Sequence, residues 1–144
     1  MESFCVKNII MEIQNEVILS KKTVAQQHLA SAYYEKMMDE FKRQNEIVIV
    51  GSGVYGLRLY EMLEADGVSL SAKCFCDNSK ERQELKIRDL PVMSVEEAVL
   101  KYPEAYYIIT PRKYENELLR QLVHLGILVD NIAIYIFMYT GLVD

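Results

Sequence analysis

The stretch that decides the fold reads IVIVGSGVYG and spans residues 47–56. Its first four residues are apolar and β-branched, which is typical of a parallel strand buried on both faces. The next six fit the pattern Gly-x-Gly-x-x-Gly, and apolar residues at helical spacing then indicate a helix that ends near Gly67. A strand, a glycine-rich turn and a helix in this order are typical of the start of a mononucleotide-binding unit.

Each glycine of this loop has a separate mechanical reason. Gly51 permits the tight turn off the strand, Gly53 lets a phosphate approach the backbone, and Gly56 lets the helix pack closely on the sheet. Unpaired N–H groups at the helix start, together with the positive end of its dipole, attract an anion. We therefore predict that the whole loop binds a nucleotide-type ligand; the alternative is a tight turn without a ligand. The predicted loop residues are Gly51, Ser52, Gly53, Val54, Tyr55 and Gly56.

Further strands and helices alternate after the loop. Strands are predicted over residues 72–76, 90–93, 106–109 and 132–136, helices over 94–101 and 114–125, and a polar loop over 79–89. Ser94 and Glu97 fit a capping box at the start of the helix over 94–101. Pro91 places the third strand near an edge, because proline lacks the N–H that a central strand donates. The alternation predicts an α/β fold, a Rossmann-like parallel sheet of about five strands in the order 3-2-1-4-5. The switch point then lies between the first and fourth strands.

The N-terminal part differs in composition from the rest. The first 46 residues contain no Gly and no Pro, and their apolar residues recur at helical spacing. We predict helices over about 4–18 and 22–44, either separate or fused. The chain is therefore divided into a helical extension over 1–45 and a nucleotide-binding domain over 46–144. Two interpretations stay open: the helices cover their own core, or they pair with a second copy as a homodimer.

Composition and charge exclude several classes of protein. With 144 residues, 51% hydrophobic and 26% charged, the chain has the composition of one globular domain. The net charge of -5 argues against a general nucleic-acid surface, which needs a basic face. No apolar run approaches the roughly 20 residues that span a membrane. The first residues lack a signal-peptide pattern, and three cysteines are too few for a secreted disulfide scaffold. We expect a cytoplasmic protein without membrane or nucleic-acid partners.

An acidic residue follows the second strand at the position where ribose is bound in such folds. Asp77 lies 21 positions after Gly56 and can accept hydrogen bonds from a ribose diol. We expect it to repel a 2′-phosphate, since Lys80 and Arg82 would lie further along a flexible loop. The alternative is that Asp77 and its neighbour Asn78 only form a turn.

A second polar group leaves the fourth strand on the other side of the switch point. Thr110 could contact the distal half of a ligand. Arg112 or Lys113 could bind a second phosphate, or stay a solvated surface charge. The predicted binding residues outside the loop are thus Asp77, Asn78, Thr110 and Arg112. No catalytic residue is predicted, because the sequence has no Tyr-x-x-x-Lys pair and no nucleophile elbow. Cys74 and Cys76 share one face of a strand and are expected to be buried, with no metal site.

Five segments together resemble a known family of domains: residues 47–56, 75–78, 90–94, 107–110 and 122–127. They are similar to the Rossmann-like nucleotide- or sugar-nucleotide-binding domain attached to bacterial sugar acetyltransferases, methyltransferases and epimerases of surface-polysaccharide pathways. The resemblance covers roughly residues 46–136. It implies nucleotide-sugar binding by Gly51, Gly53 and Asp77. We expect this chain to depart from the family in two ways, by being without the attached catalytic domain and by carrying the helical extension.

Three functions stay open at this point. The first is a nucleotide-binding module, for a nucleotide-sugar above all, non-catalytic alone and linked to surface-polysaccharide or sugar metabolism. The second is the NAD-binding part of an oxidoreductase or epimerase that a catalytic partner protein completes. The third is a structural interaction domain without a ligand. The sequence leaves the ligand open between a nucleotide-sugar and NAD.

Overall fold

The computed structural model describes residues 24–136, with side chains described from residue 32 onward. The predicted helix over 4–18 and Cys5 lie outside these residues. The helices and strands are α2 (Val24–Lys42), β1 (Ile47–Val50), α3 (Val54–Ala65), β2 (Ala72–Cys76), β3 (Lys86–Ile87), β4 (Leu90–Met93), α4 (Val95–Lys101), β5 (Tyr106–Ile109), α5 (Glu115–His124) and β6 (Ile132–Ile134). Short 3-10 turns occupy Ser69–Ser71, Arg82–Glu84 and Val129–Asn131.

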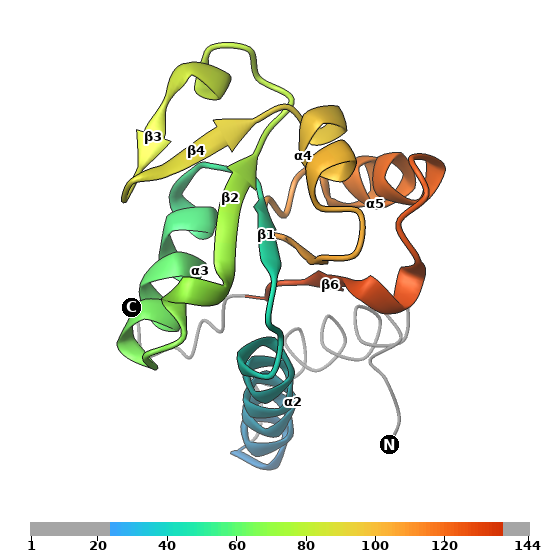
Figure 1. The fold of residues 1–144 in the computed structure, drawn as a ribbon. Helices are drawn as coiled ribbons and strands as arrows, with labels where there is room; N and C mark the ends of the chain where they lie inside the picture. The colour runs from blue at the N-terminus through green and yellow to red at the C-terminus, as the bar shows by residue number, and fades with distance from the viewer. Residues whose placement is uncertain (1–23, 137–144) are drawn as a thin grey trace.

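One six-stranded sheet runs through the molecule in the order β3-β4-β2-β1-β5-β6 (Figure 1). Every neighbouring pair is parallel except β3 with β4. The α/β class and the parallel pairing of the long strands were predicted. The central strand β1 is buried along its whole length, as a continuous apolar run requires when helices cover both faces of a sheet.

The observed sheet differs from the predicted one in its number of strands and in its complete strand order. Strand β3 arises inside the segment that the sequence predicted as a polar loop, so the sheet has six strands and a different edge. Two residues are too few to show an alternating pattern, and β3 exists only because it pairs with β4 across a tight turn. Arg88 and Asp89 form that turn with φ values of 52° and 67°. The last strand also ends earlier than predicted, at Ile134.

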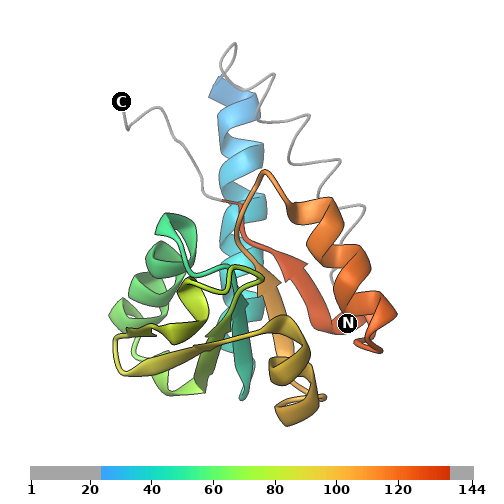
Figure 2. The ribbon, with the colours of Figure 1, turned by 90° about the horizontal axis from the view of Figure 1, so that it is seen from above.

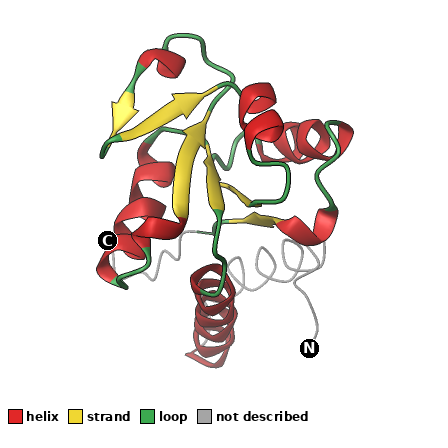
Figure 3. Cartoon of the chain, in the orientation of Figure 1, coloured by secondary structure: helices red, strands yellow, loops and turns green. Residues whose placement is uncertain are grey.

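Helices cover both faces of the sheet. Helix α3 lies on one face, and α4 and α5 lie on the other (Figures 2 and 3). The capping box predicted at the start of α4 is confirmed: the Ser94 hydroxyl accepts a hydrogen bond from the Glu97 N–H at 3.0 Å, and the Glu97 carboxylate accepts one from the Ser94 N–H.

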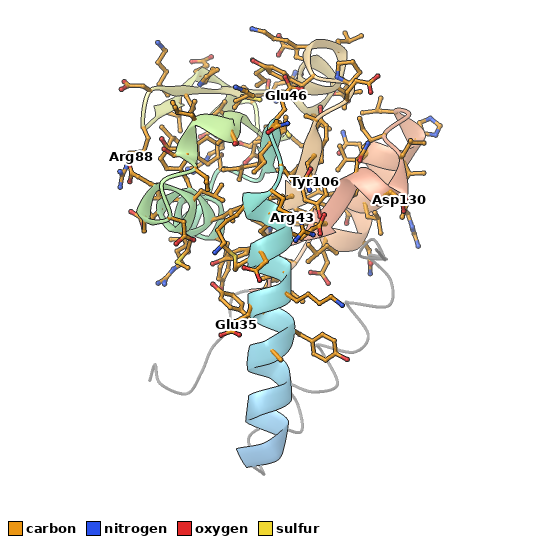
Figure 4. The ribbon with its side chains drawn as sticks, turned by 60° about the horizontal axis from the view of Figure 1, so that its bottom comes forward. Glu35, Arg43, Glu46, Arg88, Tyr106 and Asp130 are labelled. Carbon is orange, nitrogen blue, oxygen red and sulfur yellow. The ribbon has the colours of Figure 1, made fainter. Side chains whose placement is uncertain are left out.

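Helix α2 meets the sheet where β1 begins. Its buried residues Met37, Met38 and Phe41 belong to the same hydrophobic core as the strands. The Phe41 ring lies 6.0 Å from the Tyr106 ring, centroid to centroid. Figure 4 shows the neighbouring Arg43 beside Tyr106 at this junction. The helix therefore supports the end of the sheet opposite to the glycine loop. No helix in the described part of the chain is long and apolar enough to cross a membrane.

Candidate functional site

A cleft lies at the carboxyl ends of the neighbouring strands β1, β2 and β5. It consists of two adjoining cavities of about 390 Å³ and about 330 Å³. Both cavities are lined by Gly51, Asp77, Ser79, Pro111 and Tyr114. Because β1 lies between β2 and β5 in the sheet, the cleft opens at the switch point between the two halves of the fold. Open α/β sheets bind ligands at this place.

Two of the three loop glycines are required by the protein's own backbone. Gly51 has a φ of +101°, and a Cβ there would lie 2.6 Å from the side chains of Pro111 and Thr110. A Cβ on Gly56 would lie 2.1 Å from the Gly51 carbonyl oxygen. A side chain at either position would therefore displace the strand-to-helix turn.

Gly53 differs from the other two glycines. A Cβ there would meet no atom of the described chain within 4 Å, and the residue is exposed at the start of α3. Gly53 is the N-cap residue of α3 and has no side chain that could accept a hydrogen bond from the first turn of the helix. Val54 and Tyr55 belong to this turn and line the smaller cavity. The loop thus leaves open space at Gly53 beside the positive end of the α3 dipole, an arrangement that favours an anion.

Ser52 joins the glycine loop to the end of β2. Its N–H and its hydroxyl both donate hydrogen bonds to Oδ2 of Asp77, at 3.0 Å and 2.7 Å. The other carboxylate oxygen, Oδ1, accepts the N–H of Ser79 at 2.9 Å. Ser52 is buried, with 2% of its surface exposed. The two predicted parts of the site, the loop and the acid, are therefore one connected unit.

Hydrogen bonds keep the Asp77 carboxyl ionised. Partial burial by itself raises the pKa of Asp77. The bonds from Ser79 and Ser52 and the positive charge of Arg82 outweigh burial, so the pKa lies below its ordinary value of 3.8. Asp77 is therefore negatively charged at neutral pH. Its Oδ2 already accepts two hydrogen bonds, which leaves Oδ1 as the oxygen with capacity for a ligand hydroxyl.

Arg82 is the residue whose position the sequence predicted wrongly. We expected it to lie further along a flexible loop, but it lies against the glycine loop. Its Nε donates to the Ser52 hydroxyl at 3.0 Å, and its Nη2 donates to the Ser52 carbonyl. Arg82 lines the smaller cavity together with the loop. Sequence distance concealed this contact, because the two residues are 30 positions apart.

The remaining predicted residues take different positions. Thr110 is buried, and its hydroxyl donates to the Val50 carbonyl at 2.7 Å, so it holds β5 to β1 while its residue lines the cleft. Asn78 and Gln121 exchange two side-chain hydrogen bonds at 2.9 Å and 3.1 Å, which ties the end of β2 to α5 beside the larger cavity. Arg112 is exposed and is not among the residues that line the two cavities.

Several lining residues were not predicted. Besides Arg82, these are Cys76, Ser79, Pro111, Tyr114, Glu117 and Leu118. The apolar members come from the junction between β5 and α5, and Tyr114 is 49% exposed there. The segments that follow strands at the switch point commonly line ligand sites, and this rule could have predicted them. Pro111, Tyr114 and Leu118 give the larger cavity apolar lining, which suits a nucleobase.

The two described cysteines face the core. Cys74 and Cys76 are buried, as predicted, and form no disulfide. Burial raises the pKa of the Cys74 thiol to about 12, against a weaker opposing effect of Lys101, and also raises the pKa of Cys76. In the described part of the chain, no group of three or more His, Cys, Asp or Glu side chains could hold a metal ion.

Comparison with known proteins reveals likeness of fold. No protein-family model matches this sequence, and no curated protein matches it. Among solved structures, RSP, a Rex-family repressor, aligns with a TM-score of 0.54 at 18% identity, over 81% of this chain and 63% of that chain. The chain therefore spans less than two thirds of that RSP chain.

Two further RSP structures align over more of their length. The complex with β-NADH gives a TM-score of 0.53 at 16% identity, over 94% of this chain and 87% of that one. The complex with β-NAD⁺ and operator DNA gives 0.51 at 14% identity, over 98% and 90%. At these identities the alignments show the shared fold, a Rossmann-like α/β arrangement, and nothing of the ligand of this chain.

Proposed function

We propose that this chain is a nucleotide-binding module that holds its ligand across the cleft at the ends of β1, β2 and β5. The observation that carries the proposal is the loop at the start of α3. There the open Gly53, the N-terminus of α3 without a side-chain cap and the carboxylate of Asp77 border one cavity. This combination suits a molecule that has a phosphate and a ribose a short distance apart.

Each part of such a ligand has a matching surface. The diphosphate would lie over Gly53 and the first turn of α3, where a side chain is absent and the helix dipole is positive. A ribose hydroxyl would donate to Oδ1 of Asp77. The base would lie in the larger cavity, against Pro111, Tyr114 and Leu118. The Asn78–Gln121 pair lies beside this cavity and would border the base.

NAD(H) and nucleotide-sugars share this chemistry, and both are candidates. The RSP complexes with β-NADH and β-NAD⁺ support the first class, because they hold those ligands on a similar fold. The resemblance to domains of polysaccharide-pathway enzymes supports the second. We further propose that the chain serves sugar or surface-polysaccharide metabolism as a binding module without chemistry of its own. Steady turnover of NADH or of a nucleotide-sugar by the purified chain would contradict that part.

Nucleic acid is outside the proposal. The net charge of -5 disfavours a duplex-binding face. One RSP structure contains operator DNA, however, so the exclusion needs its own test. Fluorescence anisotropy with labelled duplex DNA at low salt should show no binding; saturable binding would make a ligand-responsive DNA-binding protein the better function.

Thermal denaturation and calorimetry test the main proposal. The full chain is mixed in turn with NAD⁺, NADH, NADP⁺ and UDP-glucose. A ligand at 100 times its Kd stabilises the native state by about 2.7 kcal/mol and raises the Tm. We expect such a shift with at least one probe, and its loss in Gly53→Val. Unchanged melting and no heat of binding with every probe would favour the structural interaction domain.

A further inference from the structure

We propose that Arg82 binds a phosphoryl group of the ligand, with Ser52 as the anchor that holds the guanidinium in place. The inference rests on the proposed nucleotide-binding function. It assigns a specificity-determining contact to a segment outside the glycine loop. The phosphoryl group is either part of the ligand diphosphate or an ester on the ribose; the chemistry at Arg82 is the same for both.

The first support is geometric. Arg82 uses two adjacent donors, Nε and Nη2, on the two oxygens of a single residue, Ser52. Ser52 lies between Gly51 and Gly53, so this contact holds the guanidinium at the rim of the loop where phosphate would be bound. Arg82 lines the same cavity as Gly53 and the first turn of α3. The guanidinium has five N–H groups, so donors remain after both Ser52 oxygens are satisfied.

The second support is the charge balance. Asp77 and Arg82 are the two fully charged side chains among the residues that line the smaller cavity. Asp77 takes its hydrogen bonds from Ser52 and Ser79, and Arg82 forms no ion pair with it or with another carboxylate in the described part of the chain. A half-buried guanidinium with spare donors and no direct carboxylate partner favours an anion with several acceptor oxygens, and phosphate fits its planar fork.

The third support is that the segment carrying Arg82 is fixed at both ends. On one side, the Gln83 amide donates to the Asp77 carbonyl at 2.9 Å. On the other side, Arg88 of the β3–β4 turn bonds Glu61 and Glu64 of α3, at 2.9 Å and 3.0 Å. Figure 4 shows Arg88 beside α3. Because this contact is formed before the ligand arrives, less conformational entropy is lost when the ligand binds.

The test is calorimetry on the full chain with NAD⁺, NADP⁺ and UDP-glucose, comparing wild type, Arg82→Gln and Arg82→Lys. The matched control is Lys80→Gln, which removes the same charge from an exposed residue of the same segment outside the cleft. We expect Arg82→Gln to weaken binding about tenfold to hundredfold. Arg82→Lys should recover part of the loss, because it keeps the charge but not the fork. The control should bind like the wild type, and the loss should shrink at high salt.

The three probes separate the two phosphoryl sources. A loss for NADP⁺ alone assigns Arg82 to a ribose phosphate, and equal losses for all three assign it to the diphosphate; both outcomes support the inference. Wild-type affinity in both Arg82 variants, for every probe that binds, overturns the inference and leaves the proposed function intact. If the wild type binds none of the probes, the proposed function fails and the inference fails with it. Circular dichroism checks that each variant is folded. If Arg82→Gln does not fold, the affinity of Arg82→Lys for the same probes decides the test.

Discussion

The hydroxyl of Ser52 lies 2.7 Å from Oδ2 of Asp77, although 25 residues separate the two along the chain. The hydroxyl donates this bond and at the same time accepts one from Arg82 Nε. One buried serine thus connects the glycine loop, the end of β2 and the following segment. The relationship makes Ser52 a structural centre of the cleft and not only a spacer between glycines.

Replacing Ser52 with alanine should therefore destabilise the protein. The variant removes one hydrogen bond to the Asp77 carboxylate and leaves the Arg82 Nε without its acceptor, which together cost about 1–3 kcal/mol. Urea denaturation measures the change in unfolding free energy. Ser79→Ala is the matched control, because Ser79 contacts Asp77 through its backbone N–H. Equal stability of the two variants would mean that the Ser52 hydroxyl contributes nothing.

The three loop glycines should separate into two classes on substitution. Gly53→Val places its side chain in open space, so we expect a nearly unchanged Tm and the loss of nucleotide binding. Gly56→Ala places a Cβ against the Gly51 carbonyl, so we expect a loss of about 1–3 kcal/mol of stability or more. Thermal melting and calorimetry on both variants check this. A destabilised Gly53→Val with intact binding would reverse our assignment of the loop.

The stabilising contribution of Asp77 should disappear in acid. Its pKa in the folded protein is below the ordinary value of 3.8, so its contacts stabilise the native state above that pH. The contribution is lost as the pH falls through the folded pKa. Urea denaturation of wild type and Asp77→Asn at about pH 7, 5, 4 and 3 measures it. We expect a constant difference in unfolding free energy down to about pH 5 and a shrinking one below about pH 4. If the difference in unfolding free energy persists undiminished well below the ordinary pKa, it does not come from the charge of Asp77 and reflects side-chain packing alone.

Cys74 and Cys76 should resist thiol reagents in the native protein. Burial raises both pKa values, and the reactive thiolate is rare at neutral pH. A Cys5→Ser background leaves these two thiols to be followed with Ellman's reagent. We expect labelling at least about a hundredfold slower in buffer than in urea, because reaction then requires opening of the core. Rapid labelling of either thiol in buffer would place it at the surface.

Some predictions stay open. The division of the chain at residue 45 and self-association through the N-terminal helices are both still predictions. The described part of α2 places Met37, Met38 and Phe41 in the core, so a chain that starts near Gln44 would lack these three core side chains. Light scattering on a chain that lacks residues 1–23 tests self-association through the first predicted helix, and an unchanged protomer count would contradict a role for that helix.

The sequence by itself determined the elements whose causes lie close together in the chain. A β-branched run followed by glycines predicted β1, its turn and α3, because strand burial, turn geometry and helix spacing are read over about ten residues. The capping box at Ser94 was predicted for the same reason, since its two bonds join residues three apart. The place of Asp77 after β2 was predicted as well.

Only the tertiary structure decided which side chains meet in the cleft. Arg82 contacts Ser52 across 30 positions, Thr110 bonds Val50 across 60, and Asn78 reaches Gln121 across 43. The two-residue strand β3 exists only through its pairing with β4. These contacts depend on how parallel strands bring the ends of distant segments to one edge of the sheet, and local spacing along the sequence carries no record of that geometry.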